Sequence, residues 1–127
     1  MAANNEKKGR TVTSPVEGLE VKSYVGSGYD RTHIFGTWCV AYLNNCDEYT
    51  VNTMMERHVK SDEVFVLLKG TATLYIGRDR TPVPMELHKI YNVTAGTWHN
   101  ITCSTDASVL IAENSDTDKT NTDYFQL

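Results

Sequence analysis

The sequence predicts an all-β protein that forms a single small barrel or sandwich. Short segments that are either continuously apolar or alternate between apolar and polar residues follow one another, with turn residues between them. No stretch combines a helical period with helix caps. Many short strands at even spacing are typical of sandwiches and closed barrels. The length of 127 residues fits one domain that buries its core without disulfide bonds.

The expected strands share a high content of β-branched and aromatic side chains. Residues 64–68 are continuously apolar, which is typical of a strand covered on both faces, and Gly70 ends this segment. Loops are expected at 44–47 and 78–82, where turn-forming residues gather. In chain order, we expect strands at 19–24, 34–43, 49–58, 64–68, 71–76, 89–93, 98–103 and 108–112, with a short edge strand at 124–125.

The first residues depart from this pattern. Residues 1–15 are polar and are expected to be a disordered leader, or at best an edge strand, whereas residues 16–127 are expected to form the barrel domain. The leader lacks the apolar stretch of a signal peptide, and no apolar run reaches the length of a membrane span. We therefore expect no association with a membrane.

Charge and cysteine content narrow the class of protein. The net charge is -4 and the Lys and Arg residues are scattered, so nucleic acid is not an expected partner. The three cysteines, Cys39, Cys46 and Cys103, are odd in number and form no CxxC pair. This argues against a disulfide framework and against a thiolate zinc site. With no signal peptide in view, these features predict a cytoplasmic, reduced protein.

Four residues have side chains that could build a metal site: Glu56, His58, Glu63 and His99. Glu56 and His58 are two residues apart on an expected strand, so their side chains point to the same face. Glu63 opens the next strand and is expected to face them across a hairpin, while His99 comes from a later strand. Two imidazoles and two carboxylates converging in a barrel would suit Mn, Fe, Ni, Zn or Co. On spacing alone, however, a Glu-x-His pair on a strand is more often a surface pair.

The segment from Glu56 to Gly70 resembles the first motif of the cupin superfamily, in particular of small single-domain bacterial cupins. That motif has two His one residue apart, followed by a Glu and then a Gly. His58, Glu63 and Gly70 match it, and Glu56 stands where the first His is expected. The first motif is therefore present with one ligand position changed.

The segment from His88 to His99 resembles the second cupin motif. Gly96 and His99 match its Gly-x-x-His. His88 stands in place of an earlier Gly, Thr94 in place of a Pro, and Cys103 in place of a late Asn. The strand pattern around the two motifs extends the likeness over most of the chain.

The resemblance implies a jelly-roll barrel, also called a double-stranded β-helix, with a divalent metal ion held by the four residues. A carboxylate at Glu56 can replace the first histidine, because its oxygen binds the same cations. The alternative is a degenerate cupin in which hydrogen bonds hold Glu56 and Glu63. A homodimer is also implied, since cupins of this size commonly pair. The apolar and aromatic residues within 19–42 exceed what one small barrel must hide.

Three functions stay open at this point. The first is a metal-dependent enzyme of isomerase, lyase or oxygenase type acting on a small organic or sugar-like molecule. The second is a non-catalytic module that binds or senses a small molecule, because a fold does not fix a function. The third is a structural dimer whose barrel holds only packed core.

The remaining conspicuous residues have simpler interpretations. His33 and His88 are expected in turns or on the surface. Trp98 precedes His99, so it is expected to point to the opposite face of its strand. Met54 shares the strand parity of Glu56 and His58, which favours the interior face.

Overall fold

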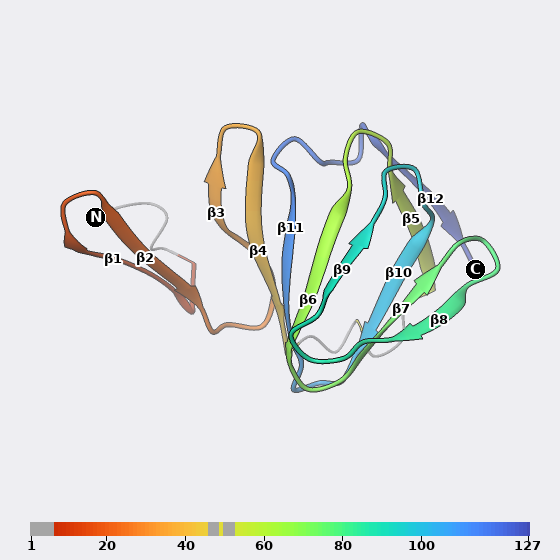
Figure 1. Ribbon diagram of the computed structural model, residues 1–127, viewed down its shortest axis with the longest axis horizontal. Helices are drawn as coiled ribbons and strands as arrows, with labels where there is room; N and C mark the ends of the chain where they lie inside the picture. The colour runs from red at the N-terminus through yellow and green to blue at the C-terminus, as the bar shows by residue number, and fades with distance from the viewer. Residues whose placement is uncertain (1–6, 46–48, 50–52) are drawn as a thin grey trace.

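The computed structural model describes residues 7–45, 49 and 53–127, and these residues form three antiparallel sheets without an α-helix (Figure 1). A two-stranded arm contains β1 (Arg10–Val16) and β2 (Leu19–Tyr24). One five-stranded sheet contains, in spatial order, β12 (Thr122–Gln126), β5 (Met54–His58), β10 (His99–Cys103), β7 (Ala72–Ile76) and β8 (Thr81–Pro84). The other contains β3 (Gly28–Phe35), β4 (Trp38–Asn44), β11 (Ser108–Asn114), β6 (Glu63–Lys69) and β9 (Ile90–Val93).

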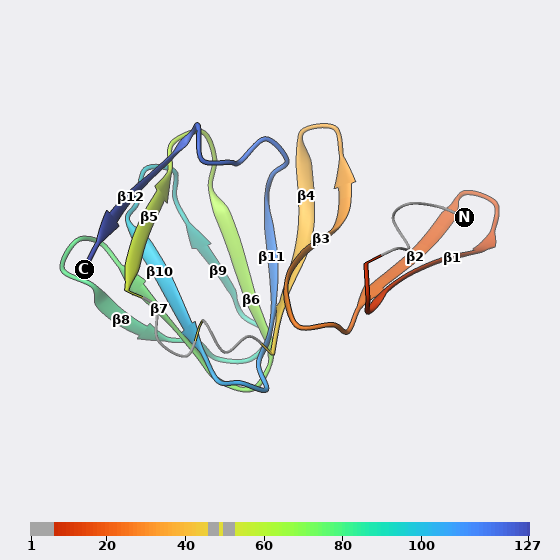
Figure 2. The same ribbon diagram turned by 180° about the vertical axis from the view of Figure 1, so that it is seen from behind.

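The two five-stranded sheets form a jelly-roll barrel. From β4 onward, most connections carry the chain from one sheet to the other, as in the steps from β5 to β6 and from β6 to β7. Figures 1 and 2 show the two sheets meeting at one end of the barrel and separating toward the other. The expected all-β barrel is therefore confirmed.

The hydrophobic core lies between the two sheets. Leu43 and Phe65 enter it from one sheet, and Leu74 and Ile101 enter it from the other. Each of these side chains is at most 5% exposed. The inward positions alternate with outward ones along each strand, so the core follows directly from the alternating pattern of the sequence.

The structure divides the segment expected as one strand at 34–43. Phe35 pairs with Trp38 across a tight turn, so β3 and β4 form a hairpin, and β3 begins as early as Gly28. Gly36 in this turn has a φ of 54°, a left-handed conformation that glycine adopts without a Cβ penalty. The two strands were predicted as one because β-forming residues flank the short turn closely on both sides, so the sequence pattern did not reveal it.

The chain also forms strands where loops were expected. Strand β1 begins at Arg10, inside the polar segment expected to be a leader, because it pairs with β2 from Arg10↔Tyr24 to Val16↔Leu19. Residues 1–6 lie outside the described residues. Strand β8 contains Pro82, which was expected in a loop; β8 lies at a sheet edge, where proline costs no ladder hydrogen bond.

Other predicted segments match more closely. Strand β12 occupies the expected C-terminal edge position, although it is longer than 124–125. In the expected strand 49–58, β5 begins at Met54, and residues 50–52 lie outside the described part, as does Cys46. Within the described residues there is no helix with the length and apolarity that a membrane crossing requires.

Gly70 is required by the turn that ends β6. Its φ is 76°, and a Cβ at this position would lie 2.7 Å from the Cα of Ala107 and 2.7 Å from the Oγ of Ser104. Neither the conformation nor the space admits a side chain. The backbone conformation and the close packing of this turn therefore explain why the first motif has a glycine here.

Candidate metal centre

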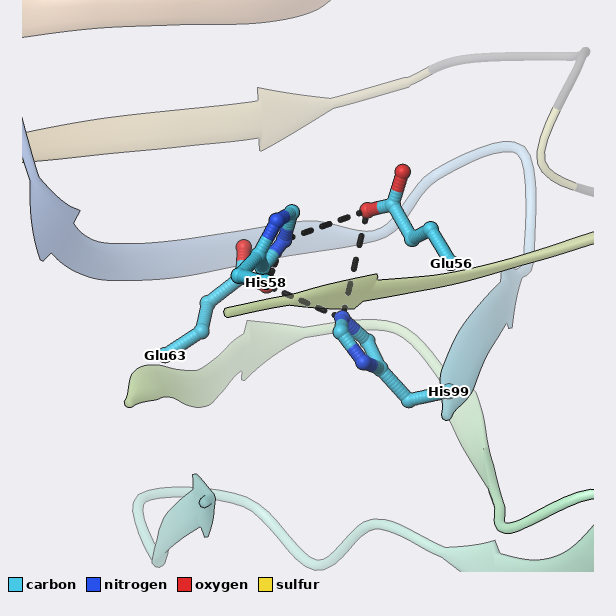
Figure 3. A group of neighbouring side chains, drawn as sticks. All are labelled: Glu56, His58, Glu63 and His99. Carbon is cyan, nitrogen blue, oxygen red and sulfur yellow. Dashed lines mark hydrogen bonds and ion pairs between the residues drawn. The ribbon is translucent and has the colours of Figure 1, made fainter. Parts of the chain in front are cut away.

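Strand geometry brings Glu56, His58, Glu63 and His99 together inside the barrel (Figure 3). Glu56 and His58 project from β5, and His99 lies on the adjacent strand β10, where it pairs with Glu56. The sequence analysis placed Glu63 in a hairpin with the strand of Glu56 and His58, and the structure contradicts this. Glu63 opens β6 in the opposite sheet and faces the other three across the interior. The expected convergence in one cavity is confirmed, by a different route for Glu63.

The facing atoms of the four side chains form a compact group. Glu63 Oε1 lies 2.9 Å from His58 Nε2 and 3.0 Å from His99 Nε2. Glu56 Oε1 lies 3.4 Å from His58 Nε2 and 3.9 Å from His99 Nε2. One donor atom from each residue lies within 4.8 Å of every other. Ligands that share a divalent ion at about 2.1 Å each are separated by about 3–4 Å, so these spacings suit one ion.

The Nδ1 atoms of the two imidazoles point away from the group and contact protein oxygens, which leaves the Nε2 atoms to bind a metal. Nδ1 of His99 lies 3.0 Å from the carbonyl oxygen of Thr97, which can only accept, so Nδ1 donates its hydrogen. Nδ1 of His58 lies 2.9 Å from the hydroxyl of Thr122, which can accept in the same way. When Nδ1 carries the hydrogen in both neutral imidazoles, both Nε2 lone pairs point into the group. Histidines that bind metals typically donate the hydrogen of the other ring nitrogen to a protein oxygen in this way.

With both Nε2 lone pairs turned inward, the group is electrostatically unfavourable until a positive charge is added. Two nitrogen lone pairs directed at a carboxylate oxygen repel it, unless each nitrogen is protonated or a cation lies between them. Consistently, Nε2 of His58 is buried and makes no well-aligned hydrogen bond, although Glu63 is close. The chemistry of this donor set therefore fits a divalent metal ion.

Protons would supply the positive charge when no metal is bound. Burial lowers the pKa of His58, but the nearby carboxylates of Glu56 and Glu63 outweigh this effect and raise the pKa to about 10. The pKa of His99 is also raised, because Glu63 outweighs the effect of burial. The two imidazoles in turn hold the pKa of Glu63 below its usual value against the opposing effect of burial.

A cavity of about 490 Å³ extends from the four residues and is lined by both sheets. Four carboxyl groups line it, those of Glu56, Glu63, Glu113 and Asp118, and Arg31 is the guanidinium among the lining residues. The volume lies in the range of pockets that hold small organic molecules. The cavity is thus large enough for a ligand in addition to an ion.

Glu113 is a member of the site that the sequence did not reveal. It is buried on β11 and its Oε1 accepts hydrogen bonds from the hydroxyl of Tyr29, at 2.8 Å, and from Nη2 of Arg31, at 3.3 Å. Burial raises the pKa of Glu113, and the adjacent Glu63 raises it further. The expected strand ended at 112. Had it been extended by one residue, the parity of Val109 and Ile111 would have placed Glu113 inside.

Arg31 is tied to the cavity wall. Its Nη1 donates to the carbonyl oxygen of Ser115 at 2.9 Å, and its Nη2 donates to that of Thr117 at 2.6 Å. Its Nε lies 3.3 Å from the hydroxyl oxygen of Tyr29. With Glu113 as a further partner, the guanidinium orders the end of β11 instead of presenting a free fork to the cavity.

The other sequence candidates lie largely as expected. His88 is exposed in a turn with a φ of 66°, and His33 lies on β3, away from the cavity, with Nδ1 2.9 Å from Nζ of Lys22. Trp98 packs against Phe125 and is not a lining residue, whereas Met54 lines the cavity, as its parity indicated.

Comparison with known proteins shows the fold and no closer relationship. No family profile matches the sequence, and no curated protein matches it either. Among solved structures, the chain is similar to Pac13 from Streptomyces, a nucleoside dehydratase, with 9% identity, a TM-score of 0.62, and coverage of 94% of this chain and 87% of Pac13. A variant of Pac13 has been solved with uridine.

Two further solved structures are similar. KdgF from Halomonas sp. is 8% identical, with a TM-score of 0.58 and coverage of 87% of this chain and 90% of KdgF. A cupin-2 domain protein from Shewanella frigidimarina is 17% identical, with a TM-score of 0.55 and coverage of 68% of this chain and 79% of that protein. At these identities the likeness establishes the cupin-type barrel fold, and function has to be argued from the site.

Proposed function

We propose that the cavity holds a divalent metal ion through His58, His99, Glu63 and Glu56, and that the protein acts there on a small neutral molecule. The observation that supports this most directly is the facing of two imidazole Nε2 atoms toward one carboxylate oxygen at 2.9 and 3.0 Å. Two ionised carboxylates and two neutral imidazoles would balance a divalent charge. When bound, such an ion acts as a Lewis acid on a carbonyl or hydroxyl oxygen.

The charges of the cavity wall favour a neutral, hydroxyl-rich ligand over an anion. Four carboxyl groups line the cavity, and its Arg31 is already engaged by backbone carbonyls and Glu113. A carboxylate or phosphate entering this space would meet like charges, and the charge of the proposed ion is already balanced by Glu56 and Glu63. The similarity to Pac13, for which a structure with the neutral nucleoside uridine exists, is in keeping with this ligand class.

The side chains of this chain supply groups for proton transfer. The side chain of Glu56 is 36% exposed, so it can exchange protons with a bound ligand as well as hold a metal. Glu113 has a raised pKa and therefore keeps its proton to a higher pH than an ordinary glutamate. A base and an acid across one cavity support isomerase-type or lyase-type chemistry.

Metal content tests the proposal first. Protein dialysed against Mn, Fe, Ni, Zn or Co and then freed of excess should retain about one ion per chain by elemental analysis. His58→Ala and His99→Ala should abolish this content. His88→Asn is the matched control, since it removes an exposed histidine and asparagine tolerates the left-handed conformation. Equal metal content in His88→Asn and His99→Ala would contradict the assignment.

Ligand class is tested separately by calorimetry with matched pairs. Uridine and uridine monophosphate differ by one phosphate, as do a hexose and its phosphate. We expect the neutral member of a binding pair to bind at least about 10-fold more tightly. Tighter binding of the phosphorylated member would overturn the charge assignment while leaving the metal assignment intact.

A metal-free binding module is the second candidate. It is favoured by the same contacts, because two imidazolium groups and two carboxylates would also neutralise one another without an ion. This alternative predicts ligand binding without retained metal and without turnover. Turnover that is lost on chelation and restored by one added metal would exclude it.

A further inference from the structure

A second cavity, of about 310 Å³, lies where the two large sheets end, and we call it the edge cavity. Its wall comes from β7 and β8 of one sheet and from β9 and the turn after it in the other. Strands β8 and β9 each end their sheet, so side chains have to close the barrel between them (Figure 1). Among the described residues, none lines both this cavity and the cavity of the metal group. The edge cavity is therefore a separate space.

The wall of the edge cavity is largely apolar. Leu74 and Val93 are buried in it, at 2% and 6% exposure. Ile76, Val83 and Tyr91 pack against the core but are only partly buried, so they keep apolar surface in contact with water. An apolar molecule in this space would remove that surface from water, which contributes favourable free energy. The volume lies at the lower end of the range for pockets that hold small organic molecules.

The polar side chains of the edge cavity already have partners. The hydroxyls of Thr94 and Thr97 lie 2.9 Å from each other. The hydroxyl oxygen of Tyr91 accepts a hydrogen bond from the backbone nitrogen of Glu86 at 2.8 Å, and the amide of Asn92 donates to a carboxylate. None of the described lining residues is charged, so an ionic ligand would lose its hydration without gaining an opposite charge. These features favour an uncharged, mainly apolar ligand.

The turn at residues 94–97 borders the edge cavity and also contacts both histidines of the metal group. The carbonyl oxygen of Thr97 accepts the hydrogen bond from Nδ1 of His99 at 3.0 Å. The backbone nitrogen of Gly96 donates to the carbonyl oxygen of His58 at 2.8 Å. The conformation of this turn therefore affects the placement of both imidazoles.

A carboxylate outside the cavity ties the same turn to the strand of a third candidate ligand. Asp62 Oδ1 accepts a hydrogen bond from the backbone nitrogen of Ala95 at 2.9 Å, and Asp62 Oδ2 accepts one from Nδ2 of Asn92 at 3.0 Å. Asp62 directly precedes Glu63, which opens β6. One short turn is thus bonded to the segments that carry three of the four candidate ligands.

We propose that the edge cavity binds a small, uncharged, apolar molecule, and that this binding is coupled to metal binding through the turn at 94–97. A ligand in the cavity packs against Thr94 and Thr97. A metal ion on Nε2 of His99 favours the turn conformation in which Thr97 accepts from Nδ1. Both events favour the same conformation, so each should strengthen the other. The coupling rests on the proposed metal site, whereas the edge cavity does not.

Toluene is a suitable probe for the edge cavity. In nuclear magnetic resonance of the full chain, its protons should show Overhauser contacts to the methyl groups of Ile76 and to the ring of Tyr91. Benzoate has the same ring with a carboxylate and should bind there at least about 10-fold more weakly. Val83→Phe places a ring in the cavity and should abolish the contacts. Val25→Phe is the matched control, because Val25 is 76% exposed and lines neither cavity.

Three results would overturn the assignment of the edge cavity. Toluene close to its solubility limit might show no contact with Ile76 or Tyr91 in the wild-type chain. A folded Val83→Phe variant might bind toluene as the wild type does. Benzoate might bind at Ile76 as tightly as toluene, which would refute the ligand class. The first result needs no variant, so a failure of Val83→Phe to fold would still leave the assignment open to refutation.

The coupling is tested by titrating Zn with and without saturating toluene. We expect toluene to lower the dissociation constant of Zn by at least about 5-fold, and Zn to lower that of toluene by the same factor. Val25→Phe should keep this response, and Val83→Phe should lose it. Unchanged Zn affinity while toluene contacts Ile76 would refute the coupling. A chain that retains no metal would refute the metal site and the coupling together, whereas the contacts with Ile76 would still establish the edge cavity.

Discussion

The interior of the barrel near β5 and β10 and the outer side of the β3–β4 hairpin differ from an ordinary globular domain in opposite ways. Inside, His58, Glu63 and His99 are polar and buried. Outside, Phe35 and Trp38 are aromatic and exposed. Most buried positions in a domain are apolar and most large exposed patches are polar, so both regions call for an explanation beyond folding.

The two regions lack different things. Burying charged groups is costly unless opposite charge is near, so the interior requires a cation or protons. Aromatic side chains that cluster in water forgo the favourable free energy of burial, so the outer face would be stabilised by another apolar surface. One side of the comparison therefore predicts sensitivity to metal and pH, and the other predicts sensitivity to protein concentration.

The largest expected effect comes from removing one interior partner. His99→Ala leaves the buried Glu63 carboxylate with one imidazole fewer, and should lower the free energy of unfolding of the metal-free protein by about 3 kcal/mol. Phe35→Ser on the outer face should change it by less than about 0.5 kcal/mol at concentrations where the chain is monomeric. Denaturation in urea with a chelator present measures both. A Phe35→Ser effect as large as that of His99→Ala would break the comparison.

The next effect is the pH dependence of the metal-free protein. The pKa of His58 is raised from 6.5 to about 10, so its protonated form stabilises the fold fully below pH 6.5. This contribution is lost as the pH rises through the raised pKa, so the melting temperature of chelated protein should fall between pH 6.5 and about 10. Bound metal should abolish the fall, because both imidazoles are then neutral. Calorimetry should also show proton release on metal binding at pH 7.

The carboxylate at the changed motif position should have a smaller effect. Glu56→Gln keeps the shape but removes a charge, and should weaken metal binding by about 100-fold, while Glu63→Gln should abolish it. The order follows from burial, since the side chain of Glu56 is 36% exposed and that of Glu63 only 8%. Unchanged metal content in Glu56→Gln, with loss in His58→Ala, would make Glu56 a bystander.

The smallest expected effect concerns a residue that only orients a ligand. Thr122→Val removes the hydroxyl beside Nδ1 of His58 and should lower metal affinity by about 10-fold without changing the number of ions bound. Thr11→Val, on the exposed arm where the Thr11 hydroxyl lies 2.6 Å from that of Ser23, offers a control for the loss of a threonine hydroxyl away from the cavity. If the two variants bound metal equally well, the tautomer of His58 would not depend on Thr122.

Several features could be predicted from the sequence because they depend on local periodicity. Alternating and continuously apolar segments identified the all-β barrel and most of its strands. Strand parity placed Glu56, His58 and Met54 on the interior face, and the Gly70 turn matched a position where no side chain fits. These properties follow from which face of a strand each residue occupies, and neighbouring residues alone decide that.

Tertiary structure alone decided which strands face one another. Glu63 reaches the site from the opposite sheet, and Glu113 joins it from β11, because the chain crosses to the other sheet after β5 and again after β10 instead of forming a hairpin there. The arm likewise depends on pairing between β1 and β2 and on the salt bridge from Arg10 to Asp30. Such contacts join residues distant in sequence, whose association is decided by how the whole core packs, and no local pattern records it.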